Sequence, residues 1–411
     1  MVIELLLDFT VSNYRSIRDE CTLSMEAYTK DRRNKESLIK NGKEVCLPTV
    51  GIFGANASGK SAVIEAIDFL RKMVLDSGNY SEKKPISCPG FAFCDNAKPR
   101  SSEFKIRFIS NGMEYAYSFS VLEDHIEEET LRCKSKIVFR RSGQKIDFPN
   151  TSKTDRARME MIKDLVNPNS LFLSKCSQFQ IPVTKIPFDW IADSLVIVNS
   201  QTHASNEKIL ELKEEVVKML SAADIGISDI REIEKGLRIR SAGTDIVTVK
   251  MLGITHIIRG SEGERTHELS EDEESDGTIR LLSLIPYWLD ALKKGKAVII
   301  DEIEKHLHPA IVDYLISLFT NPADNANGAQ LIFTTHDAAI PDRTNMRRDQ
   351  IWLTARDPNI GATSLYSLLD FNIRSDLRFT ANYLAGRFGA VPVIDRSRNG
   401  GRIDGEKEKS V

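Results

Sequence analysis

Residues 50–72 read VGIFGANASGKSAVIEAIDFLRK, and within them Gly54–Ser61 has the form GxxxxGK[ST]. The apolar run that leads into this loop, Val45–Phe53, predicts a strand. The apolar residues after Lys60 recur at helical spacing and predict a helix; they are Val63, Ala66, Ile67 and Leu70. A glycine-containing loop between a strand and a helix is the setting in which this pattern binds phosphate groups.

The chemistry of the loop residues suits a nucleotide. Gly54 and Gly59 permit backbone conformations and close approaches that a Cβ would hinder, so successive N–H groups can point at phosphate oxygens. The N-terminus of the following helix adds a positive dipole end. We expect Lys60 to reach the β- and γ-phosphates and Ser61 to ligate Mg²⁺, so that the cofactor is MgATP. The predicted nucleotide-binding residues of the loop are Gly54, Ala55, Asn56, Ala57, Ser58, Gly59, Lys60 and Ser61.

A pair of carboxylates follows a second predicted buried strand. Ala297–Ile300 is a short, continuous apolar run, as expected for a parallel strand whose carboxyl end carries a site, and Asp301 and Glu302 come directly after it. The pair resembles a Walker B sequence, in which Asp301 holds Mg²⁺, directly or through water, and Glu302 polarises the attacking water. A solvated strand end is the alternative interpretation.

Two further segments stand near these carboxylates in the chain. His336 comes after the apolar run 330–334, which predicts another buried strand, and by itself it is equally compatible with a structural histidine. Ser275–Thr278 lies at the end of the acidic stretch 268–276, just before a helical run at 278–292. Taken alone, this segment is an ordinary helix N-cap.

In their order, these motifs resemble the standalone ABC-type ATPases related to SMC, RecF and OLD proteins. More narrowly, the chain is similar to the AbiL- and RloA-like ATPases of bacterial abortive-infection and phage-defence operons. The residues that carry the resemblance are Asn13–Ser16, Gly54–Ser61 with Glu65 and Ala66, Ser275–Thr278, Asp301–Glu304 with Leu307–Pro309, and Thr335–Asp337. The C-terminal segments with the same resemblance are Gln350–Leu353, Ser364–Leu368 and Tyr383–Pro392.

The resemblance implies further roles for individual residues. It makes Glu302 the hydrolytic base, Lys60 and His336 catalytic, with His336 sensing the γ-phosphate, and it places Asn13 and Arg15 near the nucleotide. Ser275 and Gly277 would bind the γ-phosphate held by the opposite subunit. Residues 304–308 would form the D-loop facing the other head, and Gln178 or Gln180 are candidates for the Q-loop glutamine by residue type alone.

The roles that the resemblance implies mean that one chain cannot complete its own ATP site. ATP would therefore hold two heads together in a homodimer or a higher homo-oligomer, and hydrolysis would separate them.

The expected fold is an α/β ABC-type P-loop NTPase head with a mixed sheet, an antiparallel β subdomain near 91–141 and a helical insertion near 153–235. Residues 104–108 and 115–119 alternate with period two around Asn111-Gly112, which predicts a hairpin. A second strand pair is expected at 236–258. The predicted division is lobe I at 1–152, the helical insertion and strands at 153–262, lobe II at 263–395, and a disordered tail at 396–411.

The composition of the chain limits the kinds of partner that it is expected to bind. The 411 residues carry a formal net charge of −3, which gives no global attraction to nucleic acid. No apolar run is long enough to cross a membrane, and the six scattered cysteines show no metal-ligand spacing, so we expect a cytoplasmic protein with reduced thiols. The basic clusters Lys30–Arg33 and Arg140–Arg141 are interpreted as solvated faces.

The predicted function is that of a sensor or regulator ATPase in an antiphage, abortive-infection system, which controls a separately encoded toxin or nuclease. The resemblance implies an RloB-type Toprim-like protein as one such effector. The alternative is a RecF- or SMC-like DNA-repair ATPase that acts on nucleic acid. Neither the long coiled coil of SMC proteins nor the Toprim nuclease of OLD proteins is evident in the sequence. Segment 386–392 is interpreted as a packed turn or, alternatively, as a docking surface.

Overall fold

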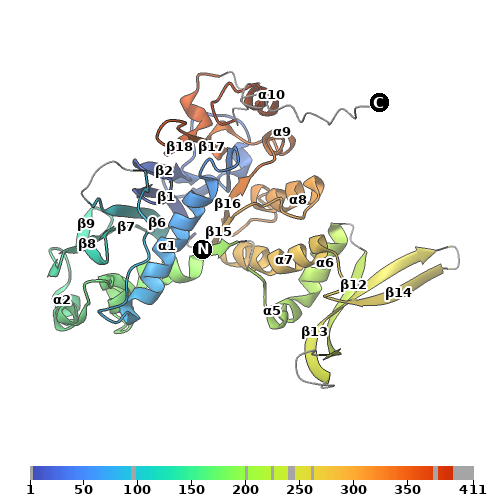
Figure 1. Ribbon diagram of the computed structural model, residues 1–411, viewed down its shortest axis with the longest axis horizontal. Helices are drawn as coiled ribbons and strands as arrows, with labels where there is room; N and C mark the ends of the chain where they lie inside the picture. Colours follow the sequence, from blue (N-terminus) through green and yellow to red (C-terminus); the bar gives the residue numbers. More distant parts are fainter. Residues whose placement is uncertain are drawn as a thin grey trace, which may run out of the picture.

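The computed structural model describes residues 3–93, 99–199, 202–223, 226–238, 246–260, 263–373 and 378–391. Figure 1 shows an α/β body from which a narrow arm of strands projects on one side. Within the described ranges, no helix is both long and apolar enough to cross a membrane. The predicted tail at 396–411 lies outside the described residues.

A six-stranded sheet forms the centre of the body, in the order β11-β15-β16-β5-β17-β18. Its first five strands run parallel and β18 pairs antiparallel with β17, so the sheet is mixed. The strands are β5 (Thr49–Gly54), β11 (Leu195–Val198), β15 (Ala297–Ile300), β16 (Gln330–Thr335), β17 (Ile351–Arg356) and β18 (Thr363–Ser367). Because neighbouring parallel strands end at the same edge, the segments that follow β5, β15 and β16 meet there.

Apolar side chains of this sheet point alternately into two cores. Val50, Ile299 and Ile332 belong to one buried cluster, whereas Val298 and Phe333 belong to the other. Such coverage of both faces explains why these strands read as continuous apolar runs rather than as alternating ones. The predicted strand Val45–Phe53 is interrupted at Pro48, which has no N–H to donate, so that β4 (Glu44–Cys46) pairs separately with β3 (Ile39–Asn41).

A seven-stranded antiparallel sheet, in the order β10-β9-β8-β7-β6-β1-β2, packs beside the central sheet. Its strands are β1 (Leu5–Ser12), β2 (Cys21–Ser24), β6 (Ser102–Ser110), β7 (Met113–Leu122), β8 (His125–Cys133), β9 (Lys136–Ser142) and β10 (Lys145–Asp147). The predicted hairpin is β6–β7, and Asn111 and Gly112 both have positive φ, 51° and 70°, as a two-residue hairpin turn requires. The N-terminal strands β1 and β2 extend this sheet further than predicted.

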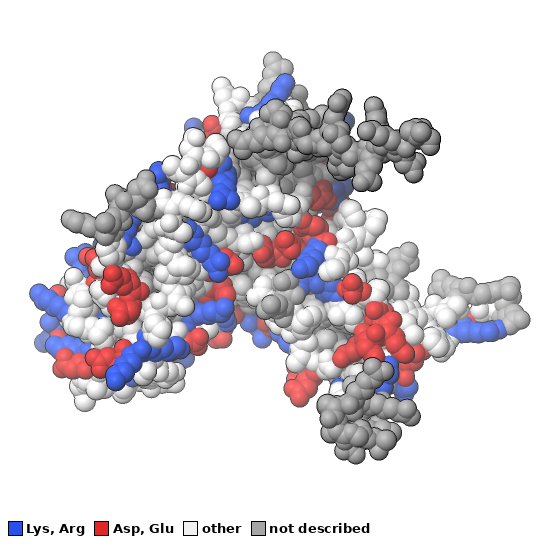
Figure 2. All heavy atoms as spheres, viewed as in Figure 1, with Lys and Arg blue, Asp and Glu red and all other residues white. Residues whose placement is uncertain are grey.

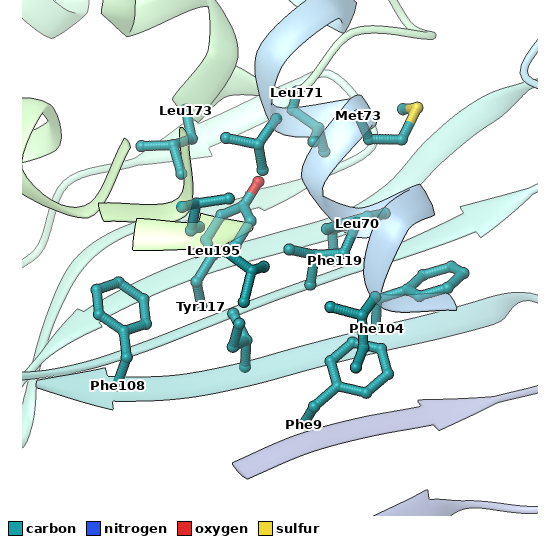
Figure 3. Packing of buried hydrophobic residues seen from close by; sticks show 14 of the residues in the cluster. Phe9, Leu70, Met73, Phe104, Phe108, Tyr117, Phe119, Leu171, Leu173 and Leu195 are labelled. Carbon is teal, nitrogen blue, oxygen red and sulfur yellow. The ribbon is translucent and has the colours of Figure 1, made fainter. Parts of the chain in front are cut away.

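Helix α1 (Lys60–Asp76) lies across the antiparallel sheet (Figure 3). Its buried apolar side chains belong to the same cluster as Val50, Ile299 and Ile332. Leu70 and Met73 face the aromatic side chains of the strands, among them Phe104 and Phe119, whose ring centroids are 5.2 Å apart. This packing fixes the axis of α1. It thereby fixes the position of the loop from which the helix begins.

The segment 153–222 is mainly helical, as predicted, but its helices are short. They are α2 (Lys153–Ile162), α3 (Phe172–Ser177), α4 (Pro182–Asp189), α5 (Asn206–Glu211) and α6 (Lys213–Ala222). A break at Leu212 separates α5 from α6. Strand β11 was not predicted, since a four-residue apolar run has no periodicity of its own.

The arm is a three-stranded antiparallel sheet of β12 (Ile227–Arg238), β13 (Ile246–Gly260) and β14 (Gly263–Ser270). The predicted strand pair corresponds to β12 and β13, and the turn expected around Gly243 lies outside the described residues. Strand β14 was missed because its exposed residues are mostly polar or charged, so that it reads as an acidic loop. Figure 1 shows that the arm leaves the body beside α5 and α6.

The second core lies between the central sheet and helices α7 (Asp276–Lys294) and α8 (Pro309–Thr320). Helices α9 (Ile340–Arg343) and α10 (Phe379–Leu384) complete the C-terminal part. The prediction of an α/β fold with a mixed sheet, an antiparallel β subdomain and a helical insertion is confirmed.

Two residues of the clusters predicted to be solvated, Asp31 and Arg141, are buried. Asp31 Oδ2 lies 2.9 Å from Arg33 Nη2. Arg141 is fully buried, and its guanidinium donates to the carbonyl oxygens of Gly143 (2.7 Å) and Ser170 (2.5 Å). It lies 3.7 Å from the equally buried Glu129. The interpretation of Arg141 as a solvated residue was therefore wrong, because β9 turns alternate side chains into the core whatever their charge.

Candidate nucleotide-binding site

The predicted phosphate loop connects β5 to α1 and is shaped by two glycines. A Cβ on Gly54 would lie 2.3 Å from Thr354 Oγ1, and one on Gly59 would lie 2.1 Å from Thr363 Oγ1. Gly59 also has φ of 104°, which L side chains rarely adopt. Ala57, at φ 59°, adopts the left-handed conformation without being a glycine. Such backbone strain in a loop is common at ligand-binding sites.

Strands β17 and β18 support this loop from the side of the sheet. Ser58 Oγ and Thr354 Oγ1 are 2.6 Å apart, and Thr363 Oγ1 donates to the Ser58 carbonyl oxygen at 3.0 Å. Thr363 Oγ1 also lies 2.8 Å from Ser16 Oγ. Sequence reasoning missed both threonines, because only the pairing of strands some 300 positions apart brings them to the loop.

Lys60 is buried, and its ammonium group is fully hydrogen-bonded. Nζ donates to the carbonyl oxygens of Gly54 (2.7 Å) and Ala55 (3.0 Å), and it lies 3.2 Å from His336 Nδ1. An ammonium group can only donate, so Nδ1 is the acceptor and a neutral His336 carries its proton on Nε2. Burial lowers the pKa of Lys60, and the nearby carboxylates, Glu304 first, oppose that effect.

The hydroxyl group of Thr334 holds the carboxylate of Asp301 and the backbone of Glu302 at the end of β15. Thr334 Oγ1 donates to Asp301 Oδ1 at 2.5 Å and accepts the backbone N–H of Glu302 at 2.8 Å. Glu302 has φ of 54°, and its Oε1 lies 3.8 Å from His336 Nε2. Thr334 was not predicted to contribute, although a polar residue inside the apolar run of β16 is a visible signal.

These side chains surround a cavity of about 490 Å³ at the N-terminus of α1. Arg15 reaches it from the loop after β1, where Arg15 Nε lies 2.8 Å from Glu65 Oε2. The residues that line the cavity are Arg15, Ser16, Asn56, Ala57, Ser58, Gly59, Lys60, Ser61, Ala62, Glu65, Glu302 and His336. Predicted residues from four separate segments therefore meet at one place.

The residues present fit a nucleotide with Mg²⁺. The cradle at Gly54 and Gly59 leaves no room for a Cβ, Lys60 supplies a cation, and the 17-residue helix α1 directs its positive end toward the cavity. Ser61 lines the cavity and is exposed, whereas Asp301 directly precedes Glu302 in the chain and is not among the lining residues. Their oxygens are the kind of ligand that Mg²⁺ prefers.

Ser275 and Gly277 lie at a different place, at the N-terminus of α7. Ser275 Oγ accepts the backbone N–H of Thr278 at 3.1 Å, as an N-cap does. A Cβ on Gly277 would lie 3.0 Å from the carbonyl oxygen of His306, so the start of α7 packs against segment 304–308. Neither residue is among those that line the 490 Å³ cavity.

Asn13, which was predicted to lie near the nucleotide, uses its side chain for contacts within the protein. Its side-chain amide donates to the carbonyl oxygen of Arg100 at 2.6 Å and accepts the backbone N–H of Phe91 at 3.1 Å. Asn13 is buried and is absent from the cavity lining, because it joins the loops around the end of β1. The Q-loop candidate Gln178 donates to Asn79 Oδ1 at 2.7 Å, also away from the cavity.

A larger cavity, of about 890 Å³, lies on the other side of the loop, between residues 55–58, the β17–β18 turn and the C-terminal turn. Ala55 N–H donates to the carbonyl oxygen of Ala390 at 3.0 Å. Phe388 is buried against Phe371 and Phe379. The structure thus agrees with the packed-turn interpretation of this C-terminal segment.

Comparison with known proteins identifies one family, described as "AAA domain, putative AbiEii toxin, Type IV TA system", which matches residues 50–158 and 194–342. These ranges include well over half of the chain and all of the motifs from β5 to β16. No curated protein matches the sequence.

Several solved structures of Smc head domains are similar to this chain. One, bound to the C-terminal winged-helix domain of ScpA, is 13% identical with a TM-score of 0.43, over 88% of this chain and 97% of that chain. A second, from Pyrococcus furiosus and with an extended coiled coil, is 13% identical with a TM-score of 0.44, over 89% and 96%. A third, from Pyrococcus yayanosii, is 10% identical with a TM-score of 0.46, over 94% and 100%.

Proposed function

The chain belongs to the family described as "AAA domain, putative AbiEii toxin, Type IV TA system", and from that premise we propose that it binds and hydrolyses MgATP at sites shared by two copies of the chain. The observation that carries the proposal is the meeting of Lys60, Glu302 and His336 at one cavity beside the N-terminus of α1. A cation, a carboxylate and a histidine around a phosphate cradle are the groups that phosphoryl transfer to water requires.

Each residue has a distinct task in this reaction. The loop N–H groups and Lys60 bind the phosphates, and Arg15 lies at the opposite wall of the cavity. Glu302 orients the attacking water and accepts its proton. His336, with its proton on Nε2, donates to a γ-phosphate oxygen. When bound, Mg²⁺ neutralises phosphate charge as the leaving oxygen departs.

The second copy is proposed because neither Ser275 nor Gly277, the ends of the serine-glycine segment, lines the cavity of its own chain. Ser275 begins the 19-residue helix α7, whose N-terminus is suited to a phosphate group. Ser275 and Gly277 are not cavity-lining residues, so a second copy that presents them would complete the site. We propose that ATP holds two heads together in this manner and that hydrolysis releases them.

The biological role that we propose is regulation of a separately encoded effector in an abortive-infection system. Its support is the family description, which refers to a toxin of a type IV toxin–antitoxin system. On the face shown in Figure 2, Lys and Arg are interspersed with Asp and Glu, and acidic residues gather beside the arm. This pattern gives less support to the RecF-like alternative, for which a basic stripe is expected.

The proposal is tested by mass measurement of the Glu302→Gln protein with MgATP, alone and after coexpression with the products of neighbouring genes. We expect a nucleotide-bound pair of heads that carries an effector. Monomers at saturating ATP would contradict the shared site. If DNA raised the rate of ATP turnover by the wild-type protein, with a steep salt dependence, the RecF-like alternative would be supported instead.

A further inference from the structure

Glu304 lies in the turn between β15 and α8, two residues after Glu302. Its side chain turns toward the end of β16, although segment 304–308 is expected to face another head. Glu304 Oε1 accepts the backbone N–H of His336 at 2.6 Å, and thereby joins this turn to the end of β16. The contact is a hydrogen bond to a charged acceptor, the kind that holds a backbone segment most firmly.

The other carboxylate oxygen of Glu304 has no hydrogen-bond partner among the described residues, although it is buried. A buried polar oxygen without a partner costs free energy, so it is not the contact that favours a glutamate here. The contact that the Glu304 side chain makes is the hydrogen bond from the His336 N–H.

The same turn is already held by its own backbone. Ile303 N–H donates to the carbonyl oxygen of Thr334 at 3.1 Å, and Leu307 N–H donates to that of Glu304 at 2.9 Å. Loss of the Glu304 side chain therefore leaves the turn in place and removes its link to His336.

From this arrangement we infer that Glu304 is a positioning residue of the ATP site. Through Oε1 it fixes the backbone of His336. His336 in turn lies between Lys60 and Glu302, at 3.2 Å and 3.8 Å, so a shift of its backbone displaces both contacts. The inference rests on the proposed function, since it concerns the same site.

Two variants test the hydrogen bond from the His336 N–H to Glu304. Glu304→Gln keeps an oxygen that can accept this N–H but removes the charge, whereas Glu304→Ala removes both the oxygen and the charge. The control is Glu215→Gln, which removes an exposed carboxylate on α6 that pairs with Lys293.

The first measurement is hydrogen exchange of the His336 amide in the nucleotide-free protein. We expect Glu304→Ala to accelerate exchange at this amide by about tenfold or more, as the loss of a charge-assisted hydrogen bond implies. Glu304→Gln should accelerate it less, and Glu215→Gln should leave it unchanged. Equal protection of this amide in the wild type and in Glu304→Ala would overturn the link to His336.

The second measurement is ATP turnover, with kcat and KM determined separately. We expect Glu304→Ala to lower kcat about tenfold with little change in KM, because a displaced His336 affects the transition state more than ATP binding. Glu304→Gln, which keeps an acceptor for the His336 N–H, should restore most of the rate, and Glu215→Gln should match the wild type.

The outcomes distinguish this inference from the proposed function. If the wild type turns over ATP and Glu304→Ala matches it in kcat, the inference fails and the proposed function stands. If the wild type binds no ATP, both fail together.

Discussion

Replacing Thr334 by Val tests the geometry of the carboxylate pair. The hydroxyl of Thr334 donates to Asp301 Oδ1 and accepts the N–H of Glu302, at 2.5 Å and 2.8 Å. Valine has nearly the same shape but can neither donate nor accept. The change therefore removes both contacts and leaves the backbone N–H of Glu302 without its acceptor, while the packing of β16 is preserved.

The size of the effect follows from these two hydrogen bonds. A hydrogen bond to a charged group contributes about 1.5–3 kcal/mol, and an unsatisfied buried N–H costs roughly 1–3 kcal/mol. Because Thr334 is fully buried, no water replaces the hydroxyl in the folded protein. We expect Thr334→Val to lose about 3 kcal/mol of stability. Displacement of Glu302 by about 1 Å is expected to reduce turnover up to about 100-fold.

The assay combines thermal unfolding with ATP turnover, and the control is Thr320→Val at the end of α8. The hydroxyl of Thr320 makes only a 3.3 Å contact with the carbonyl oxygen of Ser317. The control should stay within about 0.5 kcal/mol of the wild type and keep its rate. If Thr334→Val behaved like this control, Thr334 would not hold the carboxylates, and the reasoning on the site would be refuted.

Three further substitutions test other parts of the structure. Gly59→Ala places a methyl group against Thr363 at a positive φ, so nucleotide binding should be lost in a fluorescent-ATP titration, and the melting temperature should fall; normal binding would contradict the described cradle. Lys60→Met should abolish ATP binding yet raise the free energy of unfolding near pH 7, because burial lowers the pKa of Lys60. This gain in stability should shrink as the pH rises from the pKa of Lys60 in the folded protein toward 10.5, its ordinary value. Measurements of unfolding at several pH values would show the change. Glu129→Ala leaves Arg141 buried without its partner and should cost about 3–5 kcal/mol in thermal unfolding, with ATP affinity retained in whatever protein folds; a stability equal to that of the wild type would show that the pair is dispensable.

The sequence alone could locate the phosphate loop, the carboxylates after β15 and the histidine after β16. Each is a local pattern: an apolar run followed by polar residues at the end of a buried strand. Parallel strands then bring these ends together, so local signals were enough to predict which residues meet. The prediction that Arg15 approaches the loop came from resemblance, and the structure places it at the cavity wall.

The residues that support the site could not be predicted in the same way. Thr354 and Thr363 reach the loop only because β17 and β18 pair beside β5, some 300 positions away in sequence. Asn13 has a residue type suited to a ligand, but its amide is used by two backbone loops. Strand β14 carries an exposed charged face, so composition favoured a loop where pairing with β13 makes a strand.

The central claim is that two copies share each ATP site, and a mixing experiment tests it most directly. Lys60→Ala disables the phosphate cradle but keeps the serine-glycine segment, whereas Ser275→Arg disables that segment but keeps the cradle. We predict that each protein alone is inactive and that an equimolar mixture recovers ATP turnover, since a mixed pair contains one site with both intact parts. Turnover by Ser275→Arg alone, or a mixture as inactive as its components, would contradict the account.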